Sequence, residues 1–199
     1  MKENIRVIKY ETPAPDIREI RRYMGDRSGI EAIGKVIEEC LEESAECFEC
    51  RVCYGVYPVN ISGKTVDLGF ASAESKDLAK NLDGAQKAVV FAATAGLGID
   101  RLIKSYSAQS PLKSLCFDAI GTDRAESICN LFNKEIGSLY TLCRPRFSPG
   151  YGDLDISFQK KIFDELSCPS NIGVYLSGSL QMIPTKSVTA IIGVKDENS

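Results

Sequence analysis

The sequence predicts an α+β fold, a single domain in which helices pack on a twisted, largely antiparallel sheet. Segments rich in β-branched and aromatic residues, typical of strands, are mixed with amphipathic segments of helical period. The two kinds do not alternate strictly, as a doubly wound parallel sheet requires. The chain has 199 residues, of which 44% are hydrophobic, and this is enough for one domain with a substantial core.

The first half of the chain contains most of the expected strands. Residues 1–28 supply an N-terminal strand and helix, separated by Pro13 and Pro15, and form one domain with the core at 29–194. The β-branched and apolar residues of 87–94 make this the strongest strand. The expected strands are 5–10, 50–57, 59–61, 64–68 and 87–94, and the expected helices are 16–24, 29–46 and 74–82.

The second half is expected to be mainly helical. A long helical region covers 111–136, with an interruption at Gly121-Thr122 and with Gly137 as its C-cap. Residues 195–199 form a frayed tail. The other expected elements are helices at 99–106 and 157–166 and strands near 174–180 and 186–194.

Composition excludes several classes of function. The chain contains no histidine, which removes Ser-His-Asp and Cys-His catalysis and imidazole metal sites. A net charge of −3 gives no electrostatic reason to expect nucleic acid or an anionic membrane as a partner. No apolar run reaches the ~20 residues of a transmembrane helix, and the N-terminus lacks the apolar core of a signal peptide. We therefore expect a cytoplasmic protein.

Four of the eight cysteines lie close together, at Cys40, Cys47, Cys50 and Cys53. The Cys-x-x-Cys-x-x-Cys spacing of the last three is typical of zinc and iron–sulfur sites. The predicted strand opposes this interpretation, because residues i and i+3 of a strand point to opposite faces. Cys50 and Cys53 would then not converge on one metal, and the thiols would be buried in a reducing cytosol.

The loop at 144–152, Arg-Pro-Arg-Phe-Ser-Pro-Gly-Tyr-Gly, is the main candidate for a binding site. Proline fixes φ and glycine permits positive φ, so the backbone takes a specified, non-helical path. Guanidinium groups beside an aromatic ring suit a ligand that has both a carboxylate and a flat ring. From this segment alone, a turn with solvated arginines explains the residues equally well.

Further motifs follow this loop in a fixed order. An amphipathic segment at 156–166 precedes a segment at 176–193, and the order resembles the activation domain of cobalamin-dependent methionine synthase. That family has an Arg-x-x-x-Gly-Tyr loop, a helix and a Leu-Thr-Glu-Ser…Met…Pro…Ser-Val-Ser-Gly segment. Upstream, Phe91–Gly96 resembles its strand ending in Ala-Thr-Leu-Gly, and Asp118–Glu126 resembles its helix with a functional glutamate; the resemblance covers roughly residues 30–194. The matching positions after residue 140 are Arg146, Gly150, Tyr151, Leu176, Ser179, Met182, Pro184, Ser187 and Val188.

The resemblance implies that the chain binds S-adenosylmethionine. Arg146 would contact the methionyl carboxylate of that ligand. Gly150, Tyr151 and the backbone around Gly152 would lie along the nucleoside. Glu126 would face the cationic or hydroxyl-bearing part, where a carboxylate stabilises the charge of the sulfonium.

The sequence also departs from the family. Gly178 stands where the family has the glutamate of Leu-Thr-Glu-Ser, and Tyr151–Asp155 replaces a Tyr-Pro-x-Cys-Pro run. Ile191 and Ile192 replace an aromatic pair. The aspartate-bearing N-terminal segment of the family has no clear counterpart.

By this resemblance the chain is a binding module that completes an enzyme of methionine biosynthesis in trans. It would present S-adenosylmethionine for reductive methylation, and thus reactivation, of cobalamin on a partner methionine synthase or related corrinoid protein. A separate flavodoxin-type reductase would supply the electron. The chain offers no catalytic residues, and its task is to position an already activated methyl group.

Two alternatives remain open at this point. One is a small metal or iron–sulfur redox protein that uses the Cys40–Cys53 cluster. The other is an adenosylmethionine sensor without corrinoid chemistry.

Overall fold

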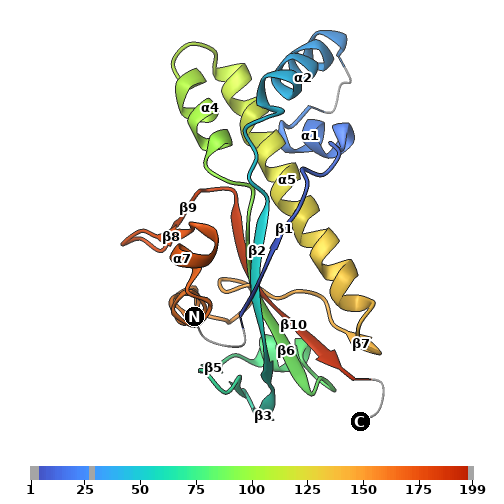
Figure 1. The fold of residues 1–199 in the computed structure, drawn as a ribbon, viewed down its shortest axis with the longest axis vertical. Helices are drawn as coiled ribbons and strands as arrows, with labels where there is room; N and C mark the ends of the chain where they lie inside the picture. The colour runs from blue at the N-terminus through green and yellow to red at the C-terminus, as the bar shows by residue number, and fades with distance from the viewer. Residues whose placement is uncertain (1–4, 27–29, 197–199) are drawn as a thin grey trace.

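The computed structural model describes residues 5–26 and 30–196, and it confirms the α+β prediction. Its centre is a five-stranded sheet of order β1-β2-β6-β10-β7 in which all neighbouring strands are antiparallel. Helices gather at one end of the sheet and along both of its faces (Figure 1). The strands of this sheet are β1 (Arg6–Lys9), β2 (Arg51–Pro58), β6 (Lys87–Thr94), β7 (Leu142–Cys143) and β10 (Ser187–Lys195).

Two smaller strand groups and seven helices complete the described part of the chain. A three-stranded sheet lies at the end of the molecule opposite α1, α2 and α4, and a short hairpin projects from the side (Figure 1). The smaller strands are β3 (Asn60–Ser62), β4 (Thr65–Asp67), β5 (Ser72–Glu74), β8 (Tyr175–Leu176) and β9 (Met182–Ile183). The helices are α1 (Ile17–Tyr23), α2 (Glu31–Ser44), α3 (Lys76–Asn81), α4 (Gly98–Tyr106), α5 (Pro111–Gly137), α6 (Phe158–Leu166) and α7 (Cys168–Ile172).

The main sheet has apolar residues on both faces, and β6 shows how they are divided. Val89, Phe91 and Ala93 belong to the core group that contains the buried residues of the C-terminal half of α5, while Val90 and Ala92 belong to the group of α3, α6 and α7. This is the alternation of a strand whose two faces are both covered by helices. The helix α5 therefore covers one face, and α3, α6 and α7 cover the other.

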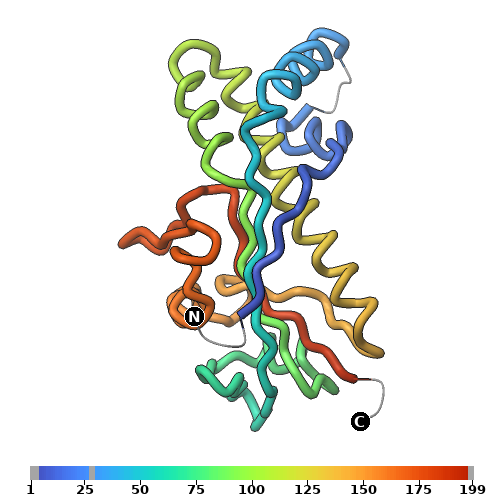
Figure 2. Tube along the Cα trace, viewed as in Figure 1, coloured from blue at the N-terminus to red at the C-terminus, as the bar shows by residue number. Residues whose placement is uncertain are grey.

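A third core group holds the helical end together. Ile20 of α1, Ile37 of α2, Ile99 of α4 and Phe117 of α5 are all fully buried in it. The chain passes from β1 into α1, returns from α2 into β2 and passes again from β6 into α4, so three strands connect this end to the sheet (Figure 2). The predicted N-terminal strand and helix thus pack directly on the rest of the molecule.

The predicted interruption of the long helix at Gly121-Thr122 is wrong, because α5 runs without a break from Pro111 to Gly137. Glycine has a packing role here: a Cβ at position 121 would lie 2.9 Å from Lys186 Cγ and 3.0 Å from Ile99 Cγ1. The bare backbone lets α4 and the chain before β10 approach the helix. Gly137 is the last helical residue, and Ser138 occupies the C-cap position.

The predicted strand at 174–180 is wrong over most of its length. β8 covers only Tyr175–Leu176, because the chain turns back between Ser177 and Gln181 and pairs with β9. The Ser177 N–H donates to the Gln181 carbonyl at 2.9 Å and closes this turn. The family-like segment is therefore a short exposed hairpin followed by β10.

Candidate binding site

A β-bulge shapes the start of the candidate loop. The Arg144 N–H donates to the Gly193 carbonyl at 2.8 Å, and Phe147 and Ile191 exchange both backbone hydrogen bonds at 2.8 Å. The loop advances three residues, from Arg144 to Phe147, while β10 advances two, from Gly193 to Ile191. The loop therefore contains one extra residue, which defines a β-bulge. Pro145 lies within the bulge, where its missing N–H costs no ladder bond.

The bulge directs Arg146 to the α5 side of the sheet. Phe147 packs with the core group of α3, α6 and α7, whereas Arg146 reaches α5 on the opposite face. Its Nη1 donates to Asn130 Oδ1 at 2.8 Å, and its Nη2 pairs with the carboxylate of Glu126. The side chain of Arg146 is 23% exposed and that of Glu126 is 41% exposed, so the pair is open to a ligand.

The pair belongs to a longer polar flank of α5. Asp118, Thr122, Glu126 and Asn130 recur at four-residue intervals and so lie on one side of the helix. Lys186 Nζ donates to Asp118 Oδ1 at 2.7 Å and to Thr122 Oγ1 at 2.9 Å. Two cations from distant parts of the chain therefore reach the same flank, each held by polar residues of α5.

A cavity of about 380 Å³ adjoins this cluster through Asn130. It forms where the proline-containing segment after β1 crosses α5, and its size is in the range of small-molecule sites. Its lining residues are Pro13, Ala14, Ser127, Asn130, Leu131 and Lys134.

The structure brings two of the predicted site residues, Arg146 and Glu126, into contact, and their role in binding a ligand stays a prediction. Their partner Asn130 was not among the predicted site residues. The four-residue spacing between Glu126 and Asn130 on a predicted helix is a signal that could have identified it.

The second half of the loop depends on two glycines with positive φ, Gly150 at 90° and Gly152 at 51°. The Gly150 N–H donates to the Leu154 carbonyl at 2.8 Å and closes the turn. Tyr151, at the tip, is 62% exposed, and its ring meets that of Phe147 edge-on with centroids 6.3 Å apart. The structure thus places Tyr151 beside Phe147 and not in the cluster of Arg146.

Asp153 attaches the end of the loop to α3. Its carboxylate accepts hydrogen bonds from the Ser75 hydroxyl, from the Lys76 N–H at 2.8 Å and from the Asp77 N–H at 3.1 Å. The Ser75 hydroxyl, followed by these backbone donors, lowers the pKa of Asp153 below its ordinary value. In return, Asp77 Oδ2 accepts from the Asp153 N–H at 3.3 Å.

The cysteine cluster does not assemble around one point. Cys50 packs with the α5 group and Cys53 with the group on the opposite face, as the predicted strand alternation requires. Cys40 is buried in the helical end and contacts Cys116, whose thiol hydrogen bond is the main cause of the lowered pKa of Cys40. In the part of the chain that is described, no three histidine, cysteine or acidic side chains are arranged to hold a metal ion.

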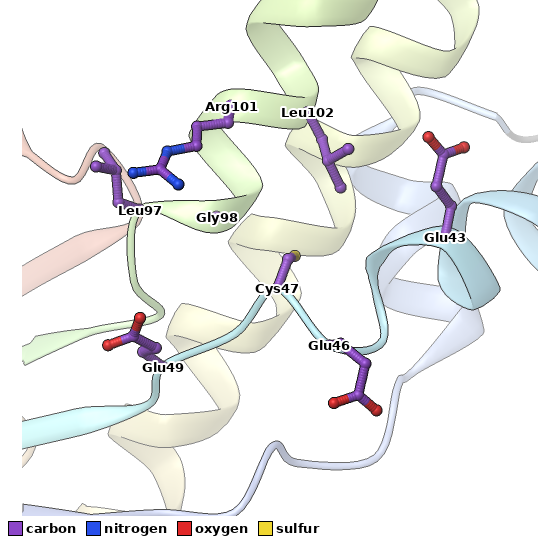
Figure 3. Close-up of a pocket in the computed structure, with 8 residues that line it drawn as sticks. All are labelled: Glu43, Glu46, Cys47, Glu49, Leu97, Gly98, Arg101 and Leu102. Carbon is purple, nitrogen blue, oxygen red and sulfur yellow. The ribbon is translucent and has the colours of Figure 1, made fainter.

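Another cavity, of about 460 Å³, lies at the helical end, away from Arg146. Figure 3 shows Cys47 and the start of α4 at its centre, with Arg101 above Glu49. The carboxylates of Glu43, Glu46 and Glu49 point in different directions and do not converge on a common ligand position (Figure 3). We therefore regard the Arg146 cluster as the better candidate.

The α+β fold of this chain, helices packed on a five-stranded antiparallel sheet, is similar to that of a solved structure. A solved structure described as the MetH reactivation domain bound to AdoHcy matches with a TM-score of 0.71. The match covers 98% of this chain and 79% of that chain at 15% sequence identity, a similarity that establishes the fold. No family model matches the chain, and no curated protein sequence matches it. Among the residues described, no helix is long and apolar enough to span a bilayer.

Proposed function

We propose that this protein is an S-adenosylmethionine-binding activation module. It would present the methyl donor for reductive methylation of cobalamin on a partner methionine synthase or related corrinoid protein. The observation that carries the proposal is the half-exposed Arg146–Glu126 pair beside a ligand-sized cavity. The AdoHcy bound to the solved neighbour of the same fold supports it.

The pair is complementary to the amino-acid end of the ligand. That end has a carboxylate and an ammonium on one carbon. The guanidinium of Arg146 and the neighbouring carboxylate of Glu126 have the charges that complement these two groups. A ligand carboxylate would take the place of Glu126 on the guanidinium and form charge-assisted hydrogen bonds with it. Glu126 would then be free to accept from the ammonium or to face the sulfonium.

The loop tip supplies a surface for the nucleoside. Gly150 and Gly152 expose backbone groups there, and the ring of Tyr151 presents a large accessible area. A ring already in contact with Phe147 loses less conformational freedom when a base stacks on it. Gly150, Tyr151 and Gly152 therefore remain our proposed nucleoside contacts.

The proposed chemistry needs only positioning from this chain. The sulfonium already activates the methyl group, so no protein acid, base or nucleophile is required. The electron would come from a flavodoxin-type reductase, and the corrinoid from the partner, in the cytoplasm. Cobalamin is thus a group of the partner and not of this chain.

Titration calorimetry with S-adenosylmethionine tests the proposal on the wild type, Arg146→Ala and Arg101→Ala. Loss of a charge-assisted contact costs about 1.5–3 kcal/mol, so Arg146→Ala should weaken binding about 10- to 150-fold. Arg101→Ala, which removes an arginine of the cavity at the helical end, should bind like the wild type.

The outcomes separate the parts of the proposal. A wild type that binds no S-adenosylmethionine refutes it, and binding that is insensitive to Arg146→Ala places the site elsewhere. Thermal unfolding of each variant checks the fold, and little change is expected because exposed ion pairs contribute only about 0–1 kcal/mol.

One observation favours a second candidate, a sensor that binds the ligand without corrinoid chemistry. Gly178, which replaces a family carboxylate, lies in the β8–β9 turn, and a Cβ there would have no neighbour within 4 Å. Position 178 is thus surrounded by open space, and it has no side chain that could supply the carboxylate. Binding without methyl transfer to a reduced corrinoid protein would favour the sensor.

A further inference from the structure

A second cavity, of about 370 Å³, lies on the other side of the bulged segment. It opens between the end of α3 and the start of the loop, on the sheet face opposite Arg146. Nothing in the proposed activation role uses it. Its lining residues are Asp77, Lys80, Asn81, Arg144, Pro145 and Phe147.

The charges of this cavity favour an anion. Arg144 is anchored, because its Nε donates to the Asp83 carbonyl at 2.9 Å and its Nη2 donates to the same oxygen. Among the described residues, neither Arg144 nor Lys80 forms an ion pair. The carboxylate of Asp77 is engaged by the Asp153 N–H at 3.3 Å. With the Asp77 carboxylate counted, the lining has two positive charges and one negative charge, and so a net positive charge in a protein whose own net charge is −3.

The rest of the lining suits a ring. Phe147 and Pro145 provide adjacent flat apolar surfaces, and backbone hydrogen bonds to β10 fix the position of Phe147. Asn81 completes the lining, and its buried Oδ1 has no hydrogen-bond donor in the described part of the protein. Buried acceptors usually have a partner, so this amide has a hydrogen-bonding capacity that the protein does not use.

We propose that this cavity is a second small-molecule site, for a phosphate-bearing ring compound of the nucleoside monophosphate class. Lys80 and the anchored guanidinium of Arg144 bind the phosphate, whose double charge matches two cations. The base lies against Phe147 and Pro145. The phosphate-binding part of the site is separate from Arg146, because the sheet lies between them, and the two proposed sites approach each other only where Phe147 contacts Tyr151.

Calorimetry with adenosine monophosphate tests this proposal, with adenosine and inorganic phosphate as separate titrants. The nucleotide should bind at least about tenfold more tightly than either fragment, since each fragment keeps only one half of the contacts. Phosphate that binds as tightly as the nucleotide overturns the ring contact, and the absence of saturable nucleotide binding overturns the site.

Two lysines of α3 provide a matched pair of variants. Lys80→Met should weaken nucleotide binding about tenfold or more. Lys76→Met removes the same charge from an exposed position of α3 outside the cavity lining, and should leave binding unchanged. Equal effects of the two variants would show only general charge attraction and overturn the assignment.

A competition experiment tests the separation of the two sites. Nucleotide binding should persist in Arg146→Ala and in the presence of excess S-adenosylmethionine. Displacement by S-adenosylmethionine would contradict a separate site, whether or not the activation role holds.

Discussion

Gly152→Ala should destabilise the protein by much more than an ordinary glycine substitution in a turn. Gly152 has φ +51°, and a left-handed conformation costs a non-glycine residue about 1–2 kcal/mol. A Cβ at this position would also lie 2.2 Å from Asp77 Oδ2. To avoid this clash, either the backbone must strain or Asp77 must give up the hydrogen bond that it accepts from the Asp153 N–H. Either change adds about 1–2 kcal/mol to the loss of stability.

The expected total of about 2–4 kcal/mol corresponds to a fall in Tm of about 4–16 °C for a chain of this size. Urea and thermal unfolding, followed by circular dichroism, measure it. Gly63→Ala is the matched control, because Gly63 has φ +63° and a Cβ there would meet nothing within 4 Å. It should show the conformational cost alone, about 1–2 kcal/mol.

A second background isolates the clash. In Asp77→Ala, the Gly152→Ala substitution should cost only as much as Gly63→Ala does in the wild type, because the obstructing carboxylate is gone. If Gly152→Ala costs no more than Gly63→Ala in the wild type, the close contact between the loop and α3 does not exist and the reasoning is refuted.

Two further predictions concern stability. Because the pKa of Asp153 is lowered in the folded state, its contribution is present above the unfolded pKa of about 3.9 and is lost as pH falls through the folded pKa. The urea midpoints of the wild type and Asp153→Asn should therefore converge as pH is lowered from about 5 toward about 2, and a constant difference would argue against the capping role. Gly98→Ala should cost about 1–3 kcal/mol, because its Cβ would lie 2.1 Å from the Cys47 carbonyl oxygen. Gly178→Ala, with open space around it, should stay within about 0.5 kcal/mol, and equal unfolding midpoints for these two variants would contradict the packing argument.

Local sequence signals were sufficient for the elements that have a clear pattern. The strand predicted at 87–94 coincides with β6, because an uninterrupted run of small, β-branched and aromatic residues fits a strand buried on both faces. The helix predicted at 157–166 matches α6 to within one residue at its start. The short elements β5, β7, α7 and β9 were missed, since two to five residues give no measurable period.

The errors arose where tertiary packing overrides a local preference. Glycine disfavours a helix interior by about 1 kcal/mol, which is why Gly121 suggested an interruption. In the fold, the contacts with Ile99 and Lys186 need the missing side chain, and no local pattern reveals those neighbours. The sheet face to which Arg146 points could likewise not be predicted from the sequence. It depends on the bulge, and the bulge is defined only by the pairing of the loop with β10.

The internal Arg146–Glu126 pair raises the question of whether it competes with a ligand. Breaking a half-exposed pair costs little, because such pairs contribute only about 0–1 kcal/mol when water can replace the partner. An amino-acid ligand gives each side chain a new partner: its carboxylate pairs with Arg146 and its ammonium with Glu126. A simple carboxylate pairs with Arg146 and leaves Glu126 without a partner. The pair should therefore select zwitterions over plain anions.

Since Glu126→Gln removes the negative partner, it should narrow the preference for S-adenosylmethionine over an analogue without the amino group. If both ligands lose affinity equally in that variant, Glu126 does not contact the ammonium.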